Sequence, residues 1–171
     1  EQKALEAFGS DSERQEKAKK EKEKFDEEQA LKKIQYEFNS LQPETKLFNK
    51  SSILYNYHIA KEKCKFDGYV YVVEGFMDIF ALAKIGIDSA VAIMGTALTK
   101  EHVQMLRALN VEVRLCLDGD LPGQTAMMEA SKLLIKEGIP CRIVDNQGSS
   151  SDPDEILNNQ GPEALKVYLT N

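Results

Sequence analysis

The sequence predicts an α/β domain built on a doubly wound, four-stranded parallel sheet with flanking helices, preceded by a long charged helix. Two observations predict this fold. Short β-rich runs alternate with helical patterns over residues 69–144 through short links, which is typical of a parallel sheet. The 171 residues also suffice for one such domain plus an additional segment. We divide the chain into a charged helical segment and connector, 1–50, and the α/β domain with its C-terminal helices, 51–171.

The charged segment over residues 10–38 is predicted to form one long, solvent-exposed helix. Lys and Glu dominate it, and pairs such as Glu13 and Lys17 have the i,i+4 spacing that stabilises a helix. Its apolar stripe is short and consists of Leu31, Ile34 and Phe38. We therefore expect the helix to dock mainly through its C-terminal end. A basic arm that touches phosphates is the alternative, but the interleaved Glu residues favour a solvated helix.

The domain elements follow a connector over residues 39–52. Apolar residues from Ile53 to Ala60 recur with helical spacing and predict the first helix. The predicted strands are Tyr69–Val73, Ala90–Ile93, Val111–Leu117 and Cys141–Val144. Three helices are predicted between and after these strands: Ile79–Ile85, a helix capped by Thr99 that ends near Leu109, and a helix that begins at Pro122 and ends at Gly138. Two short helices are predicted at the C-terminal end, one after Asp152 and one that begins at Pro162.

Acidic residues stand where the predicted strands end. Glu74 follows the first strand, and Asp118 and Asp120 follow the third. Ligands of open parallel sheets bind beyond the carboxyl ends of the strands, where the strand order reverses. If the order is 2-1-3-4, the first and third strands are neighbours and these three carboxylates meet at one edge. Asp152 and Asp154, which follow the fourth strand, can then lie nearby.

Such a cluster suits a hard cation. Packed carboxylates raise each other's pKa, and a divalent cation removes that cost. Mg²⁺ takes oxygen ligands and keeps positions for substrate phosphates, while Gly75 and Gly123 allow close approach of a phosphate to the backbone. A single Asp-Gly-Asp is usually only a turn. The joint placement of acids at alternate strand ends nevertheless indicates a Mg²⁺-dependent phosphate-handling site, with polymerase, nuclease and topoisomerase chemistry all open.

Composition limits the alternatives. The net charge of −6 is poor evidence for a stand-alone nucleic-acid binder, which usually has a basic face. No apolar run is long enough to span a membrane, and the three cysteines form no C-x-x-C pair, so no zinc ribbon is expected here. Free thiols without an export signal indicate the cytoplasm. Because the chain begins at Glu1 rather than Met, we interpret it as a processed chain or a fragment.

Several linked motifs carry a family resemblance. They are V-V-E-G-F-M-D-I at 72–79, A-I-M-G-T-A-L-T at 92–99, L-D-G-D at 117–120 and D-P-D-E at 152–155, with a weaker match at 39–50. Together they resemble the TOPRIM family, and more closely the bacterial DNA primases of the DnaG type, over about residues 39–169. The resemblance implies that residues 51–171 form a TOPRIM catalytic domain. Gln124 stands after Gly123, where the family commonly has Arg or Lys.

The resemblance implies Mg²⁺-dependent, template-directed synthesis of RNA primers for DNA replication, with Mn²⁺ as a substitute metal. It implies that Glu74, Asp118 and Asp120 are catalytic, with Glu74 acting as general acid/base or sharing in metal binding. The implied metal ligands are Glu74, Asp118, Asp120, Asp78, Asp152 and Asp154. The implied contacts to phosphate or nucleic acid are Lys50, Gly75, Gly95 and Thr96.

The resemblance also implies partners: a single-stranded DNA template, NTPs, and a replicative helicase bound through regions outside this sequence. We expect a monomer without membrane association. Two alternatives remain open, a TOPRIM metal-dependent nuclease that uses the same acids, and a non-catalytic metal- or nucleotide-binding module when the chain is isolated. The histidines His58 and His102 are expected to be ordinary surface or packing residues.

Overall fold

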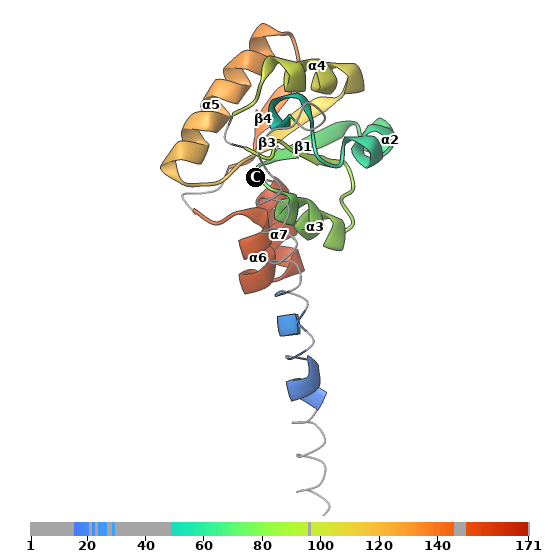
Figure 1. Ribbon diagram of the computed structural model, residues 1–171, viewed down its shortest axis with the longest axis vertical. Helices are drawn as coiled ribbons and strands as arrows, with labels where there is room; N and C mark the ends of the chain where they lie inside the picture. Colours follow the sequence, from blue (N-terminus) through green and yellow to red (C-terminus); the bar gives the residue numbers. More distant parts are fainter. Residues whose placement is uncertain are drawn as a thin grey trace, which may run out of the picture. The chain divides into compact units, whose positions relative to one another are not determined.

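The computed structural model describes residues 49–95, 97–145 and 150–170, together with part of the stretch 16–29 (Figure 1). Contacts divide the chain into two compact units, 1–45 and 46–171. The described residues of the first unit are helical and exposed, and Lys20 pairs with Glu16 at 2.9 Å with i,i+4 spacing. The remainder of the helix predicted over 10–38, and most of the 39–52 connector, lie outside the described residues.

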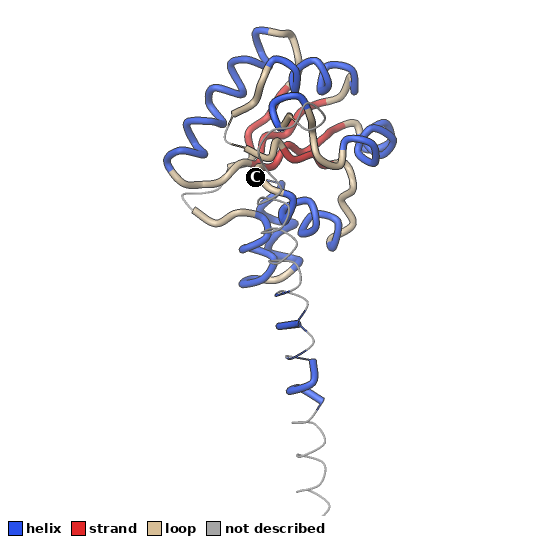
Figure 2. Tube along the Cα trace, in the orientation of Figure 1, coloured by secondary structure: helices blue, strands red, loops and turns tan. Residues whose placement is uncertain are grey.

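A four-stranded parallel sheet with the order β2-β1-β3-β4 forms the centre of the second unit (Figure 2). The strands are β1 (Tyr69–Val73), β2 (Ala90–Ala92), β3 (Glu112–Cys116) and β4 (Cys141–Ile143). Val72 of β1 pairs with Val91 of β2 on one side and with Leu115 of β3 on the other. This confirms the predicted order, in which the first and third strands are neighbours.

Helices cover both faces of the sheet. The helical elements are η1 (Lys50–Ser52, a 3-10 turn), α2 (Tyr57–Asp67), α3 (Phe76–Lys84), α4 (Lys100–Leu109), α5 (Leu121–Lys136), α6 (Pro153–Gln160) and α7 (Pro162–Thr170). Helices α2, α4 and α5 lie on one side of the sheet and α3, α6 and α7 on the other (Figure 1). Buried side chains of the first group form one core, and those of the second group form the other. Among the described residues, no helix combines the length and the apolar character that crossing a membrane requires.

The apolar run of β1 is explained by these two cores. Val70 and Val72 point into the core of α2, α4 and α5, whereas Tyr71 and Val73 point into the core of α3, α6 and α7. All four side chains are buried. A strand covered on both faces needs apolar residues at every position, so the sequence is continuous rather than alternating.

The prediction of a helix that begins at Ile53 is wrong for the residues before α2. Tyr55 instead forms an antiparallel bridge with Ala92, with N–H···O distances of 2.9 and 3.2 Å. Asn56, with a φ of 63°, then turns the chain into α2, and its side chain donates to the Ala90 carbonyl at 3.0 Å. Because this pairing is antiparallel to β2, the residues before Tyr55 lie at the carboxyl end of that strand.

Other element boundaries differ less. α3 begins at Phe76, three residues before the predicted Ile79, because the Asp78 carboxylate accepts from the Gly75 N–H at 3.0 Å and closes the first turn. Thr99 is confirmed as the N-cap of α4, where its hydroxyl accepts from the His102 N–H at 3.2 Å.

Candidate metal and phosphate site

The carboxyl edge of the sheet brings together acids that are distant in the sequence. Glu74 follows β1, and Asp118 follows the neighbouring strand β3. The Asp118 backbone N–H faces the Glu74 carboxyl group and lowers its pKa, and the Glu74 side chain likewise lowers the pKa of Asp118. The two carboxyl groups are therefore direct neighbours, as the predicted strand order requires.

Burial and mutual repulsion raise the pKa values of these acids. Burial is the main cause that raises the pKa of Glu74 to about 7, and the charges of Asp118, Asp120 and Asp152 add to it. The pKa of Asp118 is also raised, first by burial and then by the charges of Asp152 and Asp120. Four acids from three separate segments thus share one electrostatic environment that favours a bound cation.

Asp78 lies deepest in this environment and is only 4% exposed. Its carboxylate accepts from the Gly75 N–H at 3.0 Å and from the Asp154 N–H at 3.4 Å. Burial, followed by the charge of Asp152, raises the pKa of Asp78 to about 8. Asp78 therefore joins the turn after Glu74 to the first turn of α6.

Three helices begin at this edge, and acids cap two of them. Asp120 is the N-cap of α5, and its Oδ1 accepts from the Gly123 N–H at 2.8 Å. Asp152 is the N-cap of α6, and its Oδ1 accepts from the Glu155 N–H at 2.7 Å. Helix N-termini carry partial positive charge, so the starts of α3, α5 and α6 offset part of the repulsion among the carboxylates.

The first turn of α5 packs directly on the loop that carries Asp118. A Cβ atom at Gly123 would lie 2.2 Å from the Asp118 carbonyl oxygen, so no other residue fits there without a backbone shift. Gln124 donates from its side chain to the Gly119 carbonyl at 2.9 Å. At the position where the family commonly has Arg or Lys, this chain therefore uses an amide that holds the turn between Asp118 and Asp120.

The donor chemistry of this cluster fits Mg²⁺ better than a softer metal, because every candidate ligand is a carboxylate oxygen. Within the part of the chain that the structure describes, no three His, Cys, Asp or Glu side chains are arranged as a metal site. Mg²⁺ commonly binds through one or two carboxylates and several waters. Glu74 and Asp118 are two neighbouring carboxyl groups of the kind that such a site uses.

Of the expected phosphate contacts, Lys50, Gly75 and Gly95 belong to segments at the same edge. Lys50 begins η1, which lies at the carboxyl end of β2. Gly95 is exposed and follows Met94, whose φ is 56° and whose N–H donates to the Glu74 carbonyl at 3.0 Å. The Gly75 N–H donates to Asp78 and is therefore not available as a donor to a phosphate. Thr96 lies outside the described residues.

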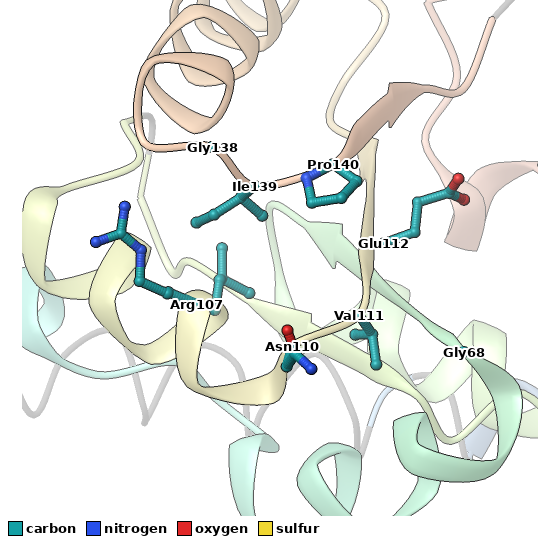
Figure 3. Close-up of a pocket in the computed structure, with 9 residues that line it drawn as sticks. Gly68, Arg107, Asn110, Val111, Glu112, Gly138, Ile139 and Pro140 are labelled. Atoms are coloured by element: carbon teal, nitrogen blue, oxygen red, sulfur yellow. The ribbon is translucent and has the colours of Figure 1, made fainter.

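A pocket of about 320 Å³ lies at the opposite edge of the sheet (Figure 3). It is lined by Gly68, Leu106, Arg107, Asn110, Val111, Glu112, Gly138, Ile139 and Pro140. Gly68 precedes β1 and Glu112 begins β3, so the pocket is at the amino ends of the strands. It contains none of the predicted site residues.

The two histidines, which were expected to be ordinary surface or packing residues, differ in burial. His58 is exposed, whereas His102 is only 1% exposed and bonds through both ring nitrogens. Its spacing from the cap residue Thr99 was a usable signal, since the third helical residue often bonds back to the N-cap backbone.

Comparison with known proteins gives consistent matches. Residues 71–157 match the model of a family described as Toprim-like. A DNA primase of Helicobacter pylori strain J99 is 38% identical over 128 residues, which cover 75% of this chain and 23% of that protein. A DNA primase of Listeria monocytogenes is 35% identical over 127 residues, or 74% of this chain and 20% of that protein. The chain therefore spans about a fifth of the length of these curated relatives.

Solved structures agree with this similarity. The zinc-binding and RNA polymerase domains of Aquifex aeolicus primase match with a TM-score of 0.67 and 33% identity, over 75% of this chain and 32% of that one. A DnaG primase catalytic domain bound to ssDNA matches with a TM-score of 0.61 and 35% identity, over 75% of this chain and 41% of that one.

Proposed function

This chain belongs to the Toprim-like family, and on that premise we propose that it supplies the metal-binding part of a DNA primase active site. The reaction is template-directed nucleotidyl transfer, in which a primer 3′-hydroxyl attacks the α-phosphate of an incoming NTP. The proposal rests on one observation, that Glu74 and Asp118 follow neighbouring strands and lie close together at the carboxyl edge of the sheet. The similarity to DNA primases over three quarters of the chain supports it.

The surroundings of each acid suit it to a different role in the reaction. Glu74, with a pKa raised to about 7, is suited to hold or release a proton near neutral pH, which is what a general acid/base requires. Asp118 and Asp120 would supply metal ligands, and Asp78, Asp152 and Asp154 would extend the acidic site. When bound, Mg²⁺ would lower the pKa of the attacking hydroxyl and neutralise charge on the departing pyrophosphate.

Lys50, Gly95 and Thr96 are proposed to meet phosphates of the nucleotide or the template, and the missing side chain of Gly75 leaves room for them. We further propose that the template is single-stranded DNA, that a replicative helicase binds through regions outside this sequence, and that the protein acts as a cytoplasmic monomer. The related catalytic domain that was solved with ssDNA supports the choice of template.

Replacing both metal-binding aspartates tests this function. In the full-length protein, Asp118→Asn with Asp120→Asn, which keeps an acceptor for the α5 cap, should abolish primer synthesis in Mg²⁺. Glu129→Ala is a matched control, since Glu129 is an exposed acid within α5. Primer synthesis by the double variant at the parental rate would reject the assignment.

We also propose that the isolated chain binds Mg²⁺ or Mn²⁺ but makes few or no primers. The chain spans only about a fifth of the length of its primase relatives, which supports this expectation. Calorimetric titration with Mn²⁺ and a labelled-NTP incorporation assay on the same sample would test both parts. Robust primer synthesis by these residues alone would contradict it, and cleavage of labelled nucleic acid without NTP incorporation would indicate a nuclease instead.

A further inference from the structure

His102 has every polar atom of its ring in use. On the first turn of α4, Nδ1 accepts from the Thr99 N–H at 3.3 Å. Nε2 faces two backbone carbonyls, that of Lys50 at 2.9 Å and that of Ile53 at 3.0 Å. Carbonyl oxygens only accept hydrogen bonds, so Nε2 carries the ring proton and Nδ1 is unprotonated. The ring therefore acts as a neutral donor toward the segment that begins with Lys50.

Thr99 completes this clamp on the same segment. Its hydroxyl donates to the Ser51 carbonyl and accepts from the His102 N–H. Together, the two side chains hold the carbonyls of Lys50, Ser51 and Ile53. The held turn, η1, has only three residues. Such a short turn has little stability of its own, so its position depends on these tertiary bonds.

The clamp holds η1 at the edge of the sheet where the carboxylates lie. The antiparallel bridge from Tyr55 to Ala92 directs the preceding residues toward the carboxyl end of β2. β2 lies next to β1, which ends at Val73, directly before Glu74. The Tyr55 ring also contacts the Phe76 ring, with centroids 6.0 Å apart, two residues after Glu74. Lys50 is thus attached to the same edge through two independent anchors.

We infer that His102 is a positioning residue that holds the Lys50 turn so that the lysine ammonium meets a phosphate of the bound nucleotide or template. This inference rests on the proposed function. His102 itself is buried and has its ring bonded to backbone, so it acts through Lys50 and not on the substrate. Loss of the Nε2 donor would release the turn while leaving the acids in place.

Two substitutions separate the two ring nitrogens. His102→Asn keeps a short acceptor for the Thr99 N–H but loses the Nε2 donor, whereas His102→Gln places an amide N–H near the Nε2 position. In the full-length protein, His102→Asn should raise the KM for template or NTP about tenfold, the loss expected for one charge-positioning hydrogen bond, with kcat nearly unchanged. His102→Gln should restore most of the parental KM.

A double-mutant cycle with Lys50→Ala tests the route through the lysine. If His102 acts by placing Lys50, Lys50→Ala should match His102→Asn, and the combined variant should be no worse than either. Additive effects in the double variant would overturn the inference, as would a fall in kcat at unchanged KM. A general structural role would produce that second pattern.

Hydrogen–deuterium exchange on the isolated chain measures how well the backbone amides of η1 are protected, and it does not require enzymatic activity. Amides of residues 49–53 should exchange faster in His102→Asn than in the parent and in His102→Gln, with the amides of β1 unchanged. Unchanged exchange over 49–53 in His102→Asn would overturn the inference. If the parental protein makes no primers, the proposed function fails, and the exchange result still decides whether His102 positions the turn.

Discussion

Replacement of the buried Asp78 by Asn gives a test of the electrostatics of the site. Asp78 is only 4% exposed, and its pKa rises from 3.8 to about 8 in the folded protein. A carboxyl group with a raised pKa in the folded state binds its proton more tightly when folded, so it stabilises the fold at low pH. That stability is lost as the pH rises from the unfolded pKa toward the folded one.

The expected magnitude follows from this pKa difference. Each pH unit between the unfolded and folded pKa costs about 1.4 kcal/mol, so three units, from pH 5 to pH 8, cost about 4 kcal/mol. The low exposure of Asp78 means that solvent screens little of this cost. Asn carries no charge and can still accept from the Gly75 N–H, so Asp78→Asn should lose much less stability over the same range.

Urea unfolding at pH 5 and pH 8.5, without divalent cations, measures this difference. The parent should lose more unfolding free energy than Asp78→Asn by about 4 kcal/mol. Asp88→Asn is the control, since the Asp88 carboxylate forms an exposed ion pair with Lys63 at 3.2 Å, and it should keep the parental pH dependence. Parallel pH profiles for the parent and Asp78→Asn would refute the argument that the buried carboxylate dominates.

Two further predictions concern metal binding and packing. Because Glu74 has a pKa of about 7, Mg²⁺ must compete with a proton for this carboxyl group below pH 7. The Mg²⁺ affinity measured by calorimetry should therefore rise about tenfold from pH 6 to pH 8. An affinity that does not change with pH would exclude Glu74 from the site. Gly123→Ala would place a Cβ atom 2.2 Å from the Asp118 carbonyl oxygen, so thermal unfolding should show a loss of about 2 kcal/mol and Mg²⁺ affinity should fall. Parental stability and affinity in that variant would contradict the close packing.

The sheet could be predicted from the sequence because each strand ends at a clear signal. The Glu74-Gly75 and Asp118-Gly119 steps mark the ends of β1 and β3, and the predicted order places them side by side. The segment around Ile53 could not be assigned in the same way. Its buried Leu54 satisfies a helix or an edge strand equally well, and only the backbone pairing with Ala92 decides between them.

The burial of Asp78 and the hydrogen bonds of His102 to η1 could not be predicted from the sequence either. Both depend on contacts between segments that are far apart in the chain, such as the Asp154 N–H with Asp78, or the Lys50 carbonyl with His102. A motif gives the residue type and its neighbours along the chain. It does not give the burial that raises the pKa of Asp78 or the backbone carbonyls that orient His102.

The acids of this site serve the fold as well as the proposed chemistry. Asp120 and Asp152 each use one carboxylate oxygen to cap a helix, and Asp78 uses both oxygens on backbone N–H groups. Alanine at these positions therefore removes a cap together with a charge, and a loss of activity would not distinguish the two. Asn can accept the same capping hydrogen bond without the charge. At Asp120 the Asn variant isolates the electrostatic contribution, because an intact α5 cap leaves only the lost charge to explain weaker metal binding.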